Sequence, residues 1–199
     1  GGGSAERNFQ FFLCEFITVQ LVAARGVKFD NFHFAGSNDT QVLQCKFNGK
    51  AGVNMGGGKA GHAIYVTKHD GQNADVHRHL WEDCEAWDIP GGCWQANGDG
   101  RRVYAVTARR LAAHDYGRFG GGLFNIAQTS GATLVDIYGD TRYDAGGVRS
   151  YDGSTGVTLD RYSITNPDGE ETDGPVQVLS DGEPSMPRFD EDIEPDATS

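Results

Sequence analysis

The residues best suited to chemistry lie in VHRHLWEDCEAW, residues 76–87, where two histidines stand one residue apart ahead of several carboxylates. In an extended strand, residues i and i+2 point to the same face, so we expect His77 and His79 to project side by side. Two imidazoles in that arrangement can bind one transition metal ion, completed by a nearby carboxylate and by His114 from a later strand. The carboxylates within reach of the pair are Glu82, Asp83 and Glu85.

The spacing around this pair resembles the first motif of the cupin superfamily. Gly71 is followed after five residues by His77-Arg-His79, then by Glu85 and, six residues later, by Gly92, while His114 takes the place of the histidine in the second motif. The resemblance covers roughly residues 62–140. It implies that one metal ion, Fe, Mn, Ni or Zn, is held in a double-stranded β-helix barrel. The implied ligands are His77, His79, Glu85 and His114, and the implied cavity walls are Trp81, Trp87, Tyr104 and Tyr116.

A cupin of this kind implies an enzyme that acts on a small, oxygen-bearing organic substrate as an oxygenase, a decarboxylase or a lyase. The metal would polarise a substrate oxygen and orient a second reactant. The same pair of histidines also fits a solvent-facing strand, where Arg78 and the acidic residues make exposed ion pairs worth only about 0 to 1 kcal/mol each.

A second arrangement pairs Cys14 with His62. A cysteine followed later by Gly-His at the start of a strand is similar to the order in NlpC/P60 and CHAP hydrolases. That resemblance implies Cys14 as nucleophile and His62 as base, with His77 or Glu82 orienting the imidazole. The alternative is a buried structural cysteine, since free cysteine is among the most buried residue types. The four cysteines, of which the others are Cys45, Cys84 and Cys93, fit two disulfides or a fully reduced protein.

The elements that must position these residues are short strands. Runs rich in β-branched and aromatic residues recur along the chain, separated by turn sequences such as HDGQ, NGDG and YDGS. The predicted strands cover residues 16–21, 41–47, 62–68, 74–81, 101–107, 133–139, 156–164 and 175–180. The expected fold class is therefore all-β, a jelly roll or double-stranded β-helix barrel with short or no helices, with at most one helical turn in residues 108–117. No internal sequence repeat is evident.

The length of 199 residues fits a single domain. We expect residues 1–4 to be a linker or processed end, residues 5–179 to form one β domain, and residues 180–199 to form an acidic, proline-bearing tail. Such a composition is typical of a segment that is disordered or lies on a partner.

The formal net charge of −11 argues against nucleic acid or an anionic membrane as partner, because like charges repel. A small-molecule substrate or a protein partner is expected instead, and self-assembly is left open. We expect no transmembrane segment and no signal peptide in this chain, and the compartment is not predicted. A non-enzymatic structural or interaction protein, such as a capsid, fibre or surface module, remains the alternative function.

Overall fold

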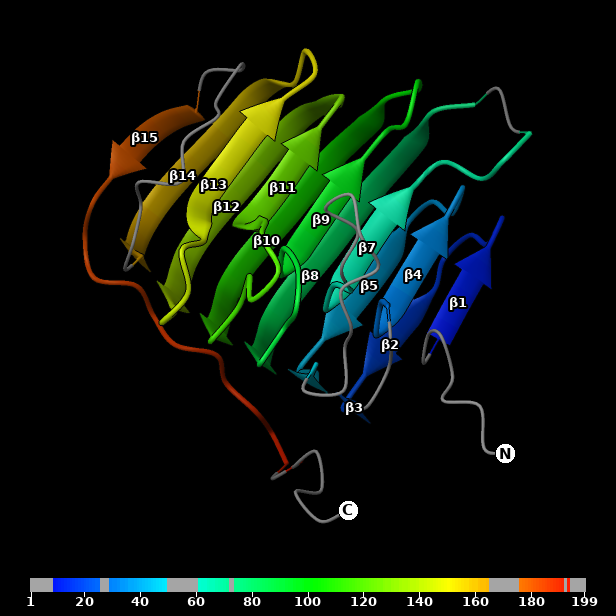
Figure 1. Cartoon of the computed structure of the whole chain (residues 1–199). Helices are drawn as coiled ribbons and strands as arrows, with labels where there is room; N and C mark the ends of the chain where they lie inside the picture. Colours follow the sequence, from blue (N-terminus) through cyan, green and yellow to red (C-terminus); the bar gives the residue numbers. More distant parts are fainter. Residues whose placement is uncertain are drawn as a thin grey trace.

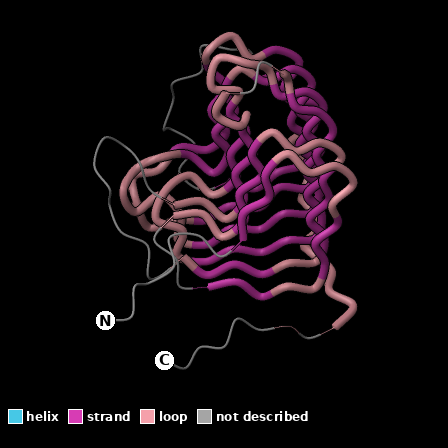
Figure 2. The backbone as a smooth tube through the Cα atoms, turned by 90° about the vertical axis from the view of Figure 1, so that its right-hand side faces the viewer, coloured by secondary structure: helices cyan, strands magenta, loops and turns pink. Residues whose placement is uncertain are grey.

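The protein is a β-solenoid whose successive turns stack into two facing sheets (Figure 1). This computed structural model describes residues 9–25, 29–49, 61–71, 74–164, 176–191 and 193. No described residue lies in a helix, which confirms the predicted all-β class. The predicted jelly-roll barrel is wrong, because every pair of neighbouring strands is parallel rather than antiparallel. Figure 2 shows the stacked turns from the side.

Six strands form one sheet and nine form the other. The first sheet runs in the order β1-β4-β7-β9-β11-β13 and the second in the order β15-β14-β12-β10-β8-β5-β2. In the second sheet β6 also pairs with β8, and β3 pairs with β6. The strands are β1 (Phe9–Phe12), β2 (Thr18–Gln20), β3 (Ala23–Arg25), β4 (Phe32–Ala35), β5 (Thr40–Leu43), β6 (Lys46–Asn48), β7 (Ile64–Thr67), β8 (Val76–Trp87), β9 (Trp94–Asn97), β10 (Val103–His114), β11 (Gly122–Ala127), β12 (Thr129–Asp140), β13 (Gly146–Tyr151), β14 (Thr155–Ile164) and β15 (Val176–Ser180).

The core fills the space between the two sheets. Equivalent positions on neighbouring turns stack in register, and one such column consists of Val42, Trp81, Ala108, Leu134 and Leu159. All five side chains are buried. Along the column the large Trp81 side chain lies next to the small Ala108 on the neighbouring turn. Each buried Leu or Val side chain contributes roughly 1.5 to 3 kcal/mol by leaving water.

Residues with positive φ interrupt the three longest strands at matching places. Arg78, Ala105 and Gly131 stack at the first bend, with φ of 57°, 55° and 76°. Asp83 and Arg110 lie at a second bend, with φ of 53° and 50°. A residue in the left-handed region breaks the alternation of side chains between the two faces. The position of each bend therefore decides which residues of these strands point outward.

Most of the predicted strands are present, but the helical turn predicted in residues 108–117 is wrong. Strand β10 continues through that stretch to His114. Six strands were not predicted: β1, β3, β4, β9, β11 and β13. All six residues of β11 are buried, so its sequence has no alternation to reveal a strand, as is typical of strands in covered parallel sheets.

The start of the acidic tail lies on the protein's own surface. Residues 181–191 run back across the long-strand sheet after β15 (Figure 1). Residues 1–4, predicted as a linker, lie outside the described residues. Within the described part, no helix is long and apolar enough to cross a membrane.

Candidate functional site

An acid–histidine cluster of Glu85, His114 and Asp140 lies on the outer face of the long-strand sheet. Glu85 comes from β8, and His114 and Asp140 are the last residues of β10 and β12. His114 is aligned with Trp87 on one side and with Asp140 on the other. Glu85 precedes Trp87 by two residues in an extended segment, so it shares their outward face and is a diagonal neighbour of His114.

Both ring nitrogens of His114 contact carboxylates. Nε2 lies 3.1 Å from Glu85 Oε1, and Nδ1 lies 2.8 Å from Asp140 Oδ1. The contact with Glu85 is the main cause that raises the pKa of His114; burial opposes it, and Asp140 adds to it. The side chains of Glu85, His114 and Asp140 are 20%, 25% and 43% exposed, so the cluster is reachable from solvent. A protonated imidazole between two carboxylates, open to water, can carry out acid–base chemistry.

Aromatic rings flank the cluster along the solenoid axis. The His114 ring lies 6.0 Å from Trp87 and 5.5 Å from Tyr138, measured between ring centroids. Tyr138 also donates a hydrogen bond from its hydroxyl to Asp140 Oδ2 at 3.3 Å. This bond and the rings hold the histidine and one of its carboxylates in place.

A charged rim lies at the turns that follow these strands. Arg142 reaches Asp88, which follows β8, at 3.7 Å and Asp115, which follows β10, at 3.4 Å. These exposed contacts are weak individually, because solvent screens them. They place one cation between the carboxylates of Asp88 and Asp115.

The structure brings together two of the four predicted metal ligands, Glu85 and His114, and places the other two elsewhere. The expectation that His77 and His79 share a face is not met, because Arg78 between them has a φ of 57° and interrupts the alternation. His77 is half-buried and stacks on Tyr104, with ring centroids 5.0 Å apart. His79 is 2% exposed.

His79 lies inside the turn of the solenoid. Its Nδ1 contacts Thr40 Oγ1 at 2.7 Å, and burial lowers its pKa to about 3. It also lines an open groove of about 540 Å³ that Asp39, Arg78 and Arg109 share. Among the described residues no group of three or more His, Cys, Asp or Glu side chains is arranged to hold a metal ion. The four predicted ligands thus form no single set in this structure, and metal binding stays a prediction.

The predicted aromatic walls are likewise distributed over the molecule. Trp81 and Tyr116 are buried in the core, with exposures of 1% and 0%. Trp87 lies beside His114, and Tyr104 lies beside His77.

Cys14 and His62 make separate contacts. Cys14 Sγ lies 3.2 Å from the carbonyl oxygen of Phe12, whereas His62 Nδ1 lies 2.7 Å from Asp30 Oδ1. All four cysteines are free thiols, and burial raises the pKa of the Cys93 thiol well above its usual value. The disulfide alternative left open by the sequence is not realised.

Two members of the site, Asp140 and Tyr138, were not predicted from the sequence. The sequence signal that could have revealed Asp140 is the nearly equal spacing of Trp87, His114 and Asp140 along the chain. Each interval corresponds to one turn of the solenoid. Comparison with protein-family models, with curated proteins and with solved structures found no match to this chain.

Proposed function

We propose that this protein binds an extended, hydroxyl-rich polymer, a polysaccharide, on the outer face of its long-strand sheet and hydrolyses it at the acid–histidine cluster. The observation that carries the proposal is the contact of both His114 ring nitrogens with carboxylates from neighbouring strands, on an exposed face. A solenoid offers a long, regular surface suited to an extended ligand. Carboxylates on that surface can accept hydrogen bonds from sugar hydroxyls.

The cluster supports a proton relay. Nε2 of the protonated His114 passes its proton to the Glu85 carboxylate, and Glu85 gives that proton to the bridging oxygen as the bond from this oxygen to carbon breaks. Asp140 takes a proton from the attacking water, whose oxygen forms the new bond to carbon. Asp140 then releases this proton to solvent, and Nε2 of His114 takes one from solvent, because Nδ1 keeps its own proton throughout. The reaction consumes one water and leaves the cluster in its starting protonation state. Paired carboxylates are the usual catalytic groups of glycoside hydrolysis.

The test is an assay of the full chain against a panel of neutral and acidic polysaccharides. New chain ends are measured by mass spectrometry and binding by titration calorimetry. We expect Glu85→Gln and Asp140→Asn each to lower the cleavage rate by about 10²- to 10⁴-fold, the usual contribution of a general acid or base. Asp99→Asn, a matched change at a turn acid that is 65% exposed, should leave the rate unchanged. Absence of cleavage across the panel, or equal rates in all three variants, would contradict the proposal.

A second candidate function is self-assembly as a fibre or surface module. The observation in its favour is a row of exposed apolar side chains at the open edge of the solenoid. Phe9, Phe12, Leu13 and Phe16 are 44%, 47%, 53% and 78% exposed. Open strand edges with apolar side chains are typical sites of strand pairing between chains.

A further inference from the structure

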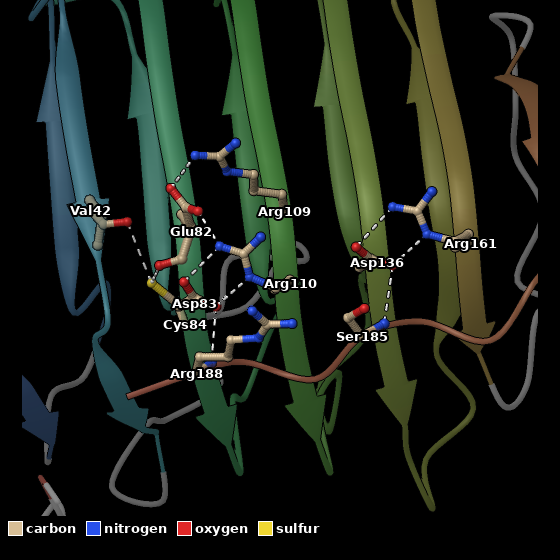
Figure 3. A network of polar contacts seen from close by, with 10 residues as sticks. All are labelled: Val42, Glu82, Asp83, Cys84, Arg109, Arg110, Asp136, Arg161, Ser185 and Arg188. Carbon is tan, nitrogen blue, oxygen red and sulfur yellow. Dashed lines mark hydrogen bonds and ion pairs between the residues drawn. The ribbon is translucent and has the colours of Figure 1, made fainter. Parts of the chain in front are cut away.

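A ladder of alternating charges follows the second bend along the solenoid. It consists of Asp83, Arg110, Asp136 and Arg161, which occupy equivalent positions on β8, β10, β12 and β14 (Figure 3). Arg110 binds Asp83 through two hydrogen bonds of 2.7 and 2.9 Å, and Arg161 binds Asp136 through two of 2.7 and 3.0 Å. Each carboxylate still has acceptor capacity, because an ionised carboxylate offers about four lone-pair sites.

A segment of the acidic tail donates hydrogen bonds to the remaining acceptor sites of these carboxylates. We name residues 181–190 the C-terminal strap. The backbone N–H of Ser185 donates to Asp136 Oδ1 at 3.1 Å, and the backbone N–H of Arg188 donates to Asp83 Oδ1 at 2.9 Å (Figure 3). Further along, the Phe189 ring lies 4.7 Å from Lys46 Nζ.

The spacing of the two N–H donors in the strap matches the spacing of the two carboxylates in the ladder. Its two donors are three residues apart, and each directly follows a proline, Pro184 or Pro187. Three residues make one turn of polyproline II helix, which rises about 9.3 Å. Asp136 and Asp83 are separated by two strand spacings, about 9.4 to 9.8 Å in total. One turn of such a segment therefore spans one repeat of the carboxylates.

Burial along the strap follows the same period. Pro184 and Pro187 are half-buried, whereas Ser185, Met186 and Arg188 are exposed. The prolines thus lie against the sheet while the donor N–H groups reach the ladder. Proline also keeps the segment extended before it binds, which lowers the entropy lost on docking.

We propose that the charge ladder is a docking surface for extended Pro-x-x-Pro segments of a partner protein, and that the C-terminal strap occupies it in the free chain. Recognition rests on main-chain N–H groups that follow each proline and meet Asp83 and Asp136 on alternate turns. The described strap residues are all exposed or half-buried, so a competing segment can displace them without opening the core. The proposal does not depend on the acid–histidine cluster.

The first test measures release of the strap in the folded, full-length chain. Trypsin cleaves after Arg188 only when that part of the strap leaves the surface. Ser185→Pro removes one donor N–H yet preserves an extended segment, so we expect native-state cleavage at Arg188 to be at least tenfold faster than in the wild type. Met186→Pro is the matched control, because Met186 lies between the two donors, and its cleavage rate should stay within about threefold of wild type.

The second test measures docking in trans. A fluorescent peptide with the sequence of residues 181–191 is titrated into full-length Ser185→Pro protein and followed by anisotropy. We expect at least tenfold tighter binding than for a peptide with one glycine inserted between Met186 and Pro187, which breaks the three-residue period. Adding Asp136→Ala to the protein removes the acceptor of the Ser185 N–H and should abolish the preference. Equal affinity for the two peptides, or no saturable binding, would overturn the proposal, as would equal trypsin cleavage of the two proline variants.

Discussion

Two histidines of this chain show how the surroundings of a residue set its chemistry. His79 is enclosed in the solenoid, where burial lowers its pKa to about 3, whereas the carboxylates around His114 raise its pKa. Their intrinsic pKa is the same, about 6.5. His79 is therefore neutral at physiological pH, and His114 favours the charged form that the acid–base proposal requires. The two side chains should contribute to stability in opposite ways as pH changes.

For His79, acid should be destabilising. Its folded-state pKa is lowered, so the unfolded chain binds the proton more tightly and stability is lost as pH falls below about 6.5. Between pH 7.5 and pH 5, wild type should lose about 2 kcal/mol of unfolding free energy relative to His79→Leu, from the linkage of a pKa of 6.5 unfolded and about 3 folded. Urea unfolding of both proteins at the two pH values measures this difference. Parallel losses in both would contradict the assignment.

For His114, the sign is reversed. Its folded-state pKa is raised, so its stabilising contribution is complete below about pH 6.5 and is lost as pH rises through the folded value. Glu85→Gln should lower the pKa of His114, because it removes the largest cause of the rise. A nuclear magnetic resonance titration of the imidazole measures the change. Glu82→Gln is the control, since the Glu82 carboxylate binds Arg109 and Arg110 instead.

Among the elements of this fold, the bends within the long strands decide which side chains line up on the outer surface. The second bend places Asp83, Arg110, Asp136 and Arg161 in one line, where each carboxylate is held by an arginine of the next strand. A bidentate arginine–carboxylate pair is both strong and geometrically specific. Arg110 on β10 contacts both Asp83 and Glu82 of β8, so the ladder ties neighbouring turns together.

Removing one member of this ladder should be costly. Arg110→Leu leaves Asp83, whose side chain is 9% exposed, without its arginine, and we expect a loss of roughly 2 to 4 kcal/mol in the free energy of unfolding. Arg78→Leu is the matched control: it removes an arginine of the first bend that binds Asp39 but is 64% exposed. Its shift in the urea midpoint should be less than a quarter of that for Arg110→Leu. Similar shifts for the two variants would show that the ladder has no special role.

Within the described residues the molecule is a stack in which each inner turn is covered by a neighbour on both sides, and its two ends are formed by β1 and β2 and by β13 and β15. Phe16 precedes β2 and has a φ of 58°, a conformation that asparagine tolerates better than phenylalanine. Its side chain is 78% exposed and contributes little to the core. Position 16 is thus one where the side chain can change with little effect on the fold.

Self-association should therefore respond to this edge more than stability does. Phe16→Asn should reduce association, measured by light scattering over a range of protein concentrations, while the unfolding free energy changes by no more than about 0.5 kcal/mol. Val178→Asn changes a 51% exposed side chain of β15 and tests in the same way whether the opposite end of the solenoid takes part in self-association. Unchanged association in Phe16→Asn would remove the support for self-assembly through the open edge.

The sequence by itself determined the all-β class, most strand positions and the acidic surface, because β-branched alternation, glycine-rich turns and charge are local properties. It also selected Glu85 and His114, which the structure brings together. It did not determine that the strands are parallel. Pairing joins residues that lie about one turn apart in the sequence, and the residue pattern of a single strand is the same for parallel and antiparallel pairing. The left-handed conformation of Arg78, which separates His77 from His79, has no local signal in an arginine. Stacking against Ala105 and Gly131 supplies that conformation, as stacking of turns places Asp140 beside His114.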